Sequence, residues 1–174
     1  MSSPESAEAT IDRESRVKDS DHEALRLWLR LLTCTNLVEG AIRSELRQSF
    51  DCTLPRFDLM AQLERHPEGL RMGELSRRLM VTGGNVTGIT DQLVKEGLVT
   101  RAAPPDDRRA FVVQLTAAGR KSFQRMAHAH EEWIVALFGA LSASERRQLY
   151  ALLAKLKAGV LAATKQADEG EDAT

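Results

Sequence analysis

The sequence predicts a mainly α-helical fold with a small β-wing, in which N- and C-terminal dimerisation helices flank a winged helix-turn-helix unit. Two observations support this prediction. Of the 174 residues, 43% are hydrophobic but only 5% are aromatic, as expected for a helical interior of Leu, Val, Ile, Ala and Met. Between Arg71 and Thr116, two helical patterns, an apolar strand, a charged loop and a second strand follow one another directly. The length fits one domain with tails and excludes large multi-domain arrangements.

Charged residues make up 28% of the chain and are unevenly distributed, although the formal net charge is only -1. Acidic residues gather near both ends, and basic residues outnumber them in the middle. The basic residues of this middle region are Arg71, Arg77, Arg78, Lys95, Arg101, Arg108, Arg109, Arg120, Lys121 and Arg125. A basic region of this kind can approach phosphate groups.

The two cysteines, Cys34 and Cys52, are too few for a disulfide framework. No apolar run is long enough for a signal peptide or a membrane span. We therefore expect a cytoplasmic protein without a membrane partner.

Residues 1–20 contain almost no large apolar side chains, so they are expected to form a disordered N-terminal arm. Residues 21–53 are expected to form a dimerisation helix that Asp21 caps. Apolar residues recur on more than one side of this helix, which predicts two packing partners: its own domain and a second subunit.

Residues 54–116 are expected to form the winged helix-turn-helix DNA-binding domain. Its first helix begins at Leu54, with Pro at the first helical position, and ends near His66. A short helix from Met72 to Met80 follows. A third helix from Gly83 to about Glu96 should bury Val86, Ile89 and Leu93 and present its other side to solvent; Thr82 caps it and Gly97 ends it.

Two strands at 98–101 and 110–115 enclose a polar, Pro-rich loop, which therefore predicts a projecting wing. Residues 117–164 are expected to form two C-terminal dimerisation helices. The second of these begins with Ser142 and, three residues later, Glu145, the spacing of a capping box. Residues 165–174 are expected to be a flexible acidic tail.

The stretch from Leu54 to Gly119 resembles the MarR (multiple antibiotic resistance regulator) family of bacterial transcription factors. The matching positions are Leu75 and Leu79, Val86-Thr87 through Asp91-Gln92-Leu93, Glu96-Gly97-Leu98-Val99, Arg101, Asp107-Arg108-Arg109 and Leu115-Thr116-Ala117-Ala118-Gly119. Each match is weak alone, but their order and spacing are specific. The flanking helices extend the resemblance over most of residues 21–163.

This resemblance implies a homodimeric winged-helix repressor that binds double-stranded operator DNA. Its recognition helices would enter two major grooves, and its wings would reach the adjoining minor grooves. Two-fold symmetry implies a palindromic operator with half-sites roughly 34–36 Å apart. The family commonly responds to small, often phenolic or aromatic, anions in a crevice between the dimer helices and the DNA-binding lobe.

The resemblance also assigns roles in the wing, where Asp107 would orient Arg109 for insertion into a minor groove. Arg108 lies between them and is a candidate for phosphate. The alternative for all three residues is a solvated, charged turn. Arg77 and Arg78 are candidates for backbone phosphate or are ordinary helix surface.

On the recognition helix, Asn85 has a side chain that can pair with adenine, and Thr87 and Gln92 can form further hydrogen bonds. Thr82, Gly84, Gly88 and Lys95 complete the predicted DNA-binding set. Many relatives carry Arg where this chain has Gly88. Each glycine in a helix costs roughly 1 kcal/mol relative to Ala. Either the glycines allow close approach to phosphates, which we favour, or the helix is loose until DNA binds.

The candidates for effector binding are Trp28, Asn36, Arg47, Phe57 and Met60, since the family places its effector crevice near the first two helices. Phe57 and Met60 at helical spacing are more often plain core, and a buried Asn36 would need a structural hydrogen-bond partner. By analogy within the family, the effector is a small aromatic carboxylate or its coenzyme A thioester.

Two other functions stay open: a winged-helix module that binds protein, and a regulator that senses redox state through Cys34 or Cys52. Neither cysteine is flanked by basic residues that would lower its thiol pKa. We expect no metal and no other cofactor, because His128 and His130 diverge on a helix. No catalytic motif is present, so an enzyme is not expected.

Overall fold

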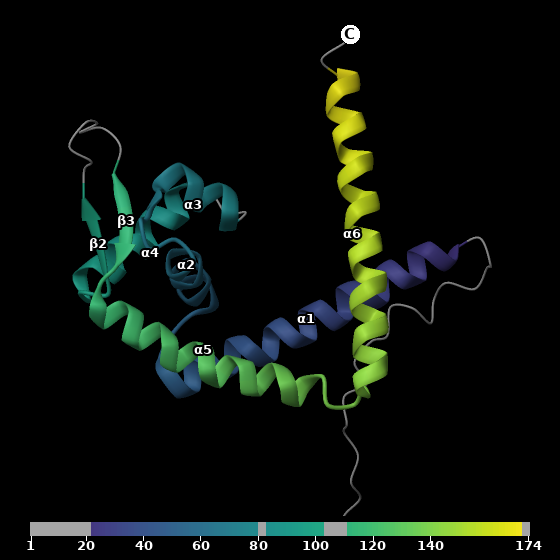
Figure 1. Ribbon diagram of the computed structural model, residues 1–174, viewed down its shortest axis with the longest axis horizontal. Helices are drawn as coiled ribbons and strands as arrows, with labels where there is room; N and C mark the ends of the chain where they lie inside the picture. The colour runs from purple at the N-terminus through teal and green to yellow at the C-terminus, as the bar shows by residue number, and fades with distance from the viewer. Residues whose placement is uncertain (1–21, 80–82, 103–110, 172–174) are drawn as a thin grey trace, which may run out of the picture. The chain divides into compact units, whose positions relative to one another are not determined.

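The computed structural model describes residues 22–79, 83–102 and 111–171 of the chain (Figure 1). Within helices, the surroundings of Gly83 and the side chains of residues 165–171 are not described. The chain divides into two compact units, residues 1–130 and 131–174, and each is described by itself. The expected arm at 1–20 and the expected cap Asp21 lie outside the described residues.

The described residues form six helices and three short strands, which confirms the predicted fold class. The first unit contains α1 (Glu23–Phe50), α2 (Leu54–Glu64), α3 (Met72–Leu79), α4 (Gly83–Lys95) and the beginning of α5 (Ala117–Leu137). The second unit contains the end of α5 and α6 (Ala143–Glu171). Asp51 caps the C-terminal end of α1. Its backbone is left-handed (φ 48°), and its amide donates hydrogen bonds to carbonyls of the last turn.

The three strands form one antiparallel sheet in the order β1-β3-β2. The predicted wing strands are confirmed as β2 (Val99–Ala102) and β3 (Val112–Leu115), with Val99 opposite Leu115. The edge strand β1 (Leu70–Arg71) was not predicted, because two residues carry no alternation signal. Gly69 (φ +88°) leads into β1 so close to β3 that a Cβ there would lie 2.7 Å from the Val113 carbonyl oxygen.

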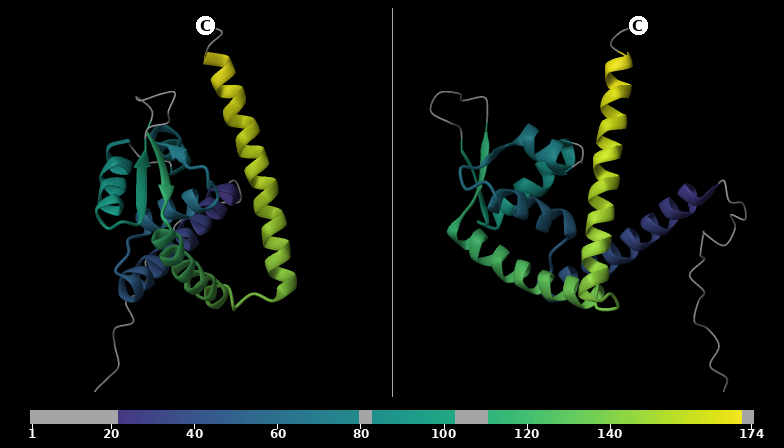
Figure 2. Two further views of the ribbon diagram at one scale, coloured as in Figure 1. Left: turned by 60° about the vertical axis from the view of Figure 1, so that its left-hand side comes forward. Right: turned by 45° about the vertical axis from the view of Figure 1, so that its right-hand side comes forward.

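The core of the first unit lies where α2, α3 and α4 meet the sheet, and Figures 1 and 2 show these elements grouped together. Its most deeply buried side chains are Leu46, Leu59, Met60, Leu63, Leu75, Val86, Leu93, Val99 and Val113. On α4, Val86 and Leu93 are buried as predicted, whereas Ile89 is only half-buried. Thr90 is fully buried instead, because its hydroxyl donates a 2.7 Å hydrogen bond to the Val86 carbonyl within the helix.

Helix α6 begins with the predicted capping box. The Ser142 amide donates to Glu145 Oε2 at 2.7 Å, and the Glu145 amide donates to Ser142 Oγ at 3.3 Å. Hydrogen bonding by the Ser142 side chain and then by the Ser142 amide lowers the pKa of the Glu145 carboxyl. The helix then continues to Glu171, past Thr164, where the flexible tail was expected to begin. Residues 165–169 contain Lys, Gln, Ala, Asp and Glu and neither Pro nor Gly, so no helix-breaking residue precedes Gly170.

The start of α5 is tied to the loop that follows α4. The Thr116 amide donates to the Leu98 carbonyl at 3.0 Å, and the Thr116 hydroxyl donates to the Gly97 carbonyl at 2.8 Å. The same hydroxyl accepts a 2.9 Å hydrogen bond from the Gly119 amide. Gly119 is buried so close to this loop that a Cβ would lie 1.8 Å from the Leu98 carbonyl oxygen. Only glycine fits there without a backbone shift.

We expect Gly119→Ala to lower the free energy of unfolding by roughly 1–3 kcal/mol or more, because the added methyl group must displace backbone. Denaturant unfolding measures the effect. Gly73→Ala is the matched control, since a Cβ at Gly73 meets nothing within 4 Å. Equal stability of Gly119→Ala and the control would contradict the close approach.

Candidate nucleic-acid interface

Helices α3 and α4 pack against each other and against α2, and α4 also contacts β2. This is the arrangement of a helix-turn-helix with an adjoining sheet. The turn at 80–82, with Thr82, lies outside the described residues. The inner side of α4 therefore packs against α2, α3 and β2, and its outer side is left for solvent or a partner.

The outer side of α4 carries the residues predicted to contact DNA. All of those that the structure describes are exposed: Gly84, Asn85, Thr87, Gly88, Gln92 and Lys95. The opposite side holds Val86, Thr90 and Leu93, each with no exposed surface. The 3.6-residue period thus separates a polar, solvent-facing side from a side that fixes the helix to the core.

The packing of the described residues does not require a glycine at position 84 or 88. A Cβ added at Gly84 or Gly88 would meet nothing within 4 Å. Both positions face open space, in contrast to Gly119. The reason for these glycines therefore lies outside the packing of this chain.

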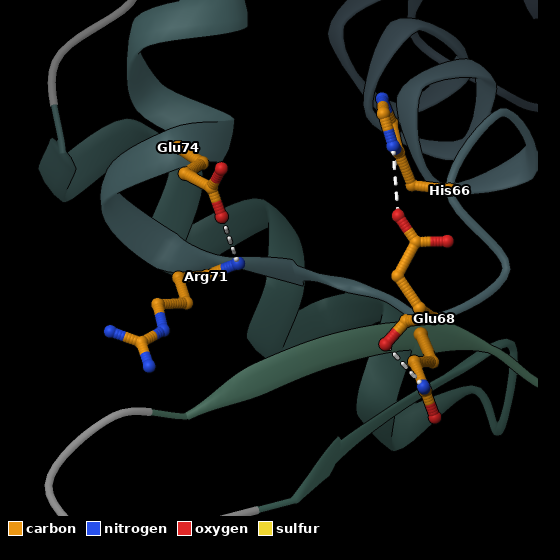
Figure 3. A network of polar contacts seen from close by, with 5 residues as sticks. His66, Glu68, Arg71 and Glu74 are labelled. Atoms are coloured by element: carbon orange, nitrogen blue, oxygen red, sulfur yellow. Dashed lines mark hydrogen bonds and ion pairs between the residues drawn. The ribbon is translucent and has the colours of Figure 1, made fainter. Parts of the chain in front are cut away.

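Arg77 and Arg78 are exposed in the last turn of α3, as predicted. The first turn of this helix is held by Glu74, whose carboxylate accepts a 3.3 Å hydrogen bond from the Arg71 amide (Figure 3). The pKa of the Glu68 carboxyl is lowered first by a hydrogen bond from the Glu68 backbone, then by His66, and least by the charge of Arg78.

Glu68 belongs to the loop between α2 and β1, which is fixed at two points (Figure 3). Its carboxylate lies 3.1 Å from His66 Nδ1, and its carbonyl accepts a 2.6 Å hydrogen bond from Gln114 Nε2 of β3. A hydrogen bond from its own backbone amide, followed by the contact with His66, lowers the pKa of the Glu68 carboxyl. The sheet, this loop and the start of α3 are thereby connected.

The predicted tip of the wing lies outside the described residues. Asp107, Arg108 and Arg109 fall within 103–110, so their predicted roles remain predictions. The structure describes the strands that lead to the tip, and these end at the pair Ala102–Val112.

Two ion pairs join α4 to its surroundings, and neither was found by sequence reasoning. Arg101 Nη2 of β2 lies 3.0 Å from Asp91 Oδ1, and Arg56 of α2 pairs with Glu96 directly after α4. The sequence marked three of these residues only as matching positions. Arg56 stands 40 positions before Glu96, so no local pattern connects the two residues.

The candidate effector residues are not brought together in the structure. Trp28, Asn36 and Arg47 are exposed along α1, so Asn36 does not need a buried partner. Phe57 and Met60 are buried, as the alternative of plain core predicts. The Phe57 ring packs 5.4 Å from the Phe123 ring and 4.9 Å from the His130 ring, measured between centroids. Burial lowers the pKa of His130, which keeps this imidazole neutral within the aromatic cluster.

Met60 also lines a cavity of about 230 Å³ in the first unit. Its other lining residues are Phe50, Asp51, Cys52, Arg56, Glu96, Leu98, Ser122 and Met126. Burial raises the pKa of the Cys52 thiol, and Arg56 opposes this effect only in part. A raised pKa keeps the thiol protonated, which does not favour the redox mechanism at Cys52; Cys34 is exposed.

Within the described ranges, no three His, Cys, Asp or Glu side chains are grouped so that they could hold a metal ion. None of the helices described is long and apolar enough to cross a membrane.

Comparison with known proteins identifies the family. The model of the MarR family matches residues 52–111. The uncharacterised HTH-type transcriptional regulator YkoM of Bacillus subtilis is 31% identical over 118 residues, which are 67% of this chain and 74% of that protein. The uncharacterised HTH-type transcriptional regulator YfiV of the same organism is 25% identical over 91% of this chain and 96% of its own length.

Solved structures agree with this result. A MarR family transcriptional regulator from Silicibacter pomeroyi superposes with a TM-score of 0.70 at 35% identity, covering 83% of this chain and 99% of its own. Sco3205 of Streptomyces coelicolor, a MarR family regulator in complex with DNA, shares the fold with a TM-score of 0.69 at 22% identity, covering 82% and 90%. The present chain belongs to the MarR family and is a DNA-binding transcriptional regulator with a winged helix-turn-helix.

Proposed function

We propose that the protein is a homodimeric repressor that binds a palindromic operator and leaves it when a small effector binds. The observation that carries this proposal is the outer side of α4, where all the described candidate residues are exposed while Val86 and Leu93 anchor the helix. The side chains of Asn85, Thr87 and Gln92 are those that hydrogen-bond base edges in a major groove. Sequence recognition is assigned to these three residues.

Affinity comes from the basic residues around this helix. Lys95, Arg77 and Arg78 bind backbone phosphates, and Arg108 in the wing adds another such contact. Arg109, oriented by Asp107, enters the minor groove, where the narrow width strengthens the negative potential that attracts a guanidinium. Thr82 and the glycines of α4 let the helix N-terminus approach the DNA backbone.

Dimerisation is assigned to residues 21–53 and 117–164. Large apolar side chains are exposed on α1 and, separately, on α6; the most exposed are Leu27, Trp28, Leu37, Tyr150, Leu152, Val160 and Leu161. Exposed apolar surface on this scale marks an interaction site. Because a two-fold dimer presents two identical recognition helices, the operator is a palindrome.

The effector is a small aromatic carboxylate or its coenzyme A thioester. Trp28 and Arg47 are exposed along α1, where an aromatic ring and a guanidinium suit such a ligand. Asn36, Phe57 and Met60 complete the proposed site. This part of the proposal rests on the family resemblance.

DNA binding should depend steeply on salt, and Arg109 should contribute strongly to it. On a fragment of the protein's own promoter, the logarithm of the affinity should fall by about 0.9 per phosphate contact for each unit of the logarithm of salt concentration.

Arg109→Ala should cost roughly 1–3 kcal/mol of operator binding, measured by fluorescence anisotropy. Analytical ultracentrifugation should show that wild type and Arg109→Ala are both dimers. Arg147→Ala, an equal charge change on exposed α6, is the control.

Unchanged operator affinity in Arg109→Ala would remove the wing assignment. Binding that is insensitive to salt, or a lack of any shifted promoter fragment, would instead favour a module that binds protein.

Gly88→Ala separates the two explanations for the glycines of α4. A Cβ at Gly88 meets nothing in the protein, so the substitution should raise stability by up to about 1 kcal/mol. If the glycine allows close approach to phosphates, operator affinity should nevertheless fall. A rise in affinity would show instead that wild-type α4 is loose. Gly40→Ala, also in open space but on α1, controls for helix propensity.

A thermal-shift screen of aromatic carboxylates and their coenzyme A thioesters tests the effector. A true effector should raise the melting temperature by mass action and release operator DNA at the same concentrations. Arg47→Gln should weaken both responses, whereas Arg125→Gln should not. If no compound of these classes produces either response, the proposed effector class is wrong.

A further inference from the structure

The recognition helix α4 has little intrinsic stability at its N-terminal end. Gly83, Gly84 and Gly88 all lie within its first six residues, and glycine is an unfavourable residue inside a helix. The position of α4 therefore depends on how its C-terminal half is attached to the rest of the unit. Besides Thr90 and Leu93 on the buried side, two arginines make this attachment.

The first arginine is Arg101 on β2, the strand that leads into the wing. Its Nη2 lies 3.0 Å from Asp91 Oδ1 and 4.0 Å from the sulfur of Met72, the first residue of α3. Arg101 is 26% exposed at its side chain and Asp91 is 50% exposed. The Arg101 guanidinium thus contacts both helices of the helix-turn-helix, α4 at Asp91 and α3 at Met72.

The second arginine is Arg56 on α2, which pairs with Glu96. Glu96 follows the last helical residue, Lys95, and continues the helical hydrogen bonding through its amide, which donates to the Gln92 carbonyl at 3.0 Å. Arg56 and Glu96 also line the cavity of about 230 Å³ described above. One side of the Arg56–Glu96 pair therefore faces this cavity and not packed side chains.

Both arginines share a feature that is unusual for a pair kept only for stability. The Nε atoms of Arg56 and Arg101 are buried and have no hydrogen-bond partner within the part of the chain that the structure describes. A buried donor without a partner lowers stability. Buried or partly buried ion pairs contribute little net stability, and their attested role is to select one arrangement.

The geometry of the two contacts suits that role. Asp91 and Glu96 are five residues apart, which places them about 140° apart around the helix axis. Two attachments on different sides oppose rotation of α4 about its own axis, which one attachment would allow. Rotation is the motion that would move Asn85 and Gln92 away from base edges.

We propose that Arg56 and Arg101 are positioning residues for DNA recognition: through Glu96 and Asp91 they fix the rotation of α4, so that its outer side meets the operator in one register. Neither arginine needs to touch DNA. The inference rests on the proposed function, since it concerns the operator-binding side of α4.

The test uses Arg56→Gln, Arg101→Gln and the charge-swapped double variant Arg56→Glu/Glu96→Arg in the full-length protein. Arg43→Gln is the control, because it removes an equal charge and breaks the exposed Arg43–Glu39 pair within α1. Affinities are measured for operator and for a scrambled duplex of equal length. Amide hydrogen exchange of α4 is measured without DNA.

We expect Arg56→Gln and Arg101→Gln to lose operator affinity roughly two- to thirtyfold. Their affinity for scrambled DNA should match that of Arg43→Gln, and α4 amides should exchange faster while α2 amides do not. The charge swap should recover operator affinity to within about twofold of wild type.

Equal losses on operator and scrambled DNA would overturn the proposal, because they indicate a charge effect alone. Unaltered α4 exchange, or a folded charge swap without recovery, would also overturn the assignment to Arg56. If a glutamine variant does not fold, Arg56→Lys and Arg101→Lys keep the charge but lose the guanidinium, and should show the same loss of operator preference. Failure of wild type to bind its promoter would contradict the proposed function, whereas the exchange measurement still tests the attachment of α4.

Discussion

The junction between Leu98 and the start of α5 is the contact on which the DNA-binding unit depends. The Leu98 amide donates to the Leu93 carbonyl of α4 at 2.9 Å, while its carbonyl accepts from the Thr116 amide at 3.0 Å. Gly119 packs directly on the same carbonyl. The end of α4, the start of β2, the end of β3 and the first turn of α5 therefore meet at one residue, Leu98.

The parts of the fold that could be predicted from sequence are those with a local cause. The burial of Val86 and Leu93 follows from helical spacing, and the box formed by Ser142 and Glu145 needs only three residues of separation. Strand β1 could not be predicted, because its two residues pair only where Gly69 brings them against β3. The contact between Arg56 and Glu96 likewise depends on how α2 and α4 pack, which no local pattern contains.

For the candidate site, the sequence predicted the outer side of α4 correctly as a set of exposed residues, because one period decides which residues face the core. Ile89 and Thr90 show the limit of that method. A hydroxyl that can return its hydrogen bond to the helix backbone is buried more completely than the neighbouring isoleucine. The extent of α6 shows a second limit, since acidic composition alone does not end a helix.

The order β1-β3-β2 has a consequence for how the protein can change over time. Strand β3 is paired on both edges at Val112 and Val113, immediately beside the segment that forms the predicted tip. Insertions or deletions before Phe111 leave these pairings in register, because both neighbours hold β3 independently of the tip's length. The wing can thus exchange its tip sequence, and with it the minor-groove contacts proposed above, while α3 and α4 keep their places.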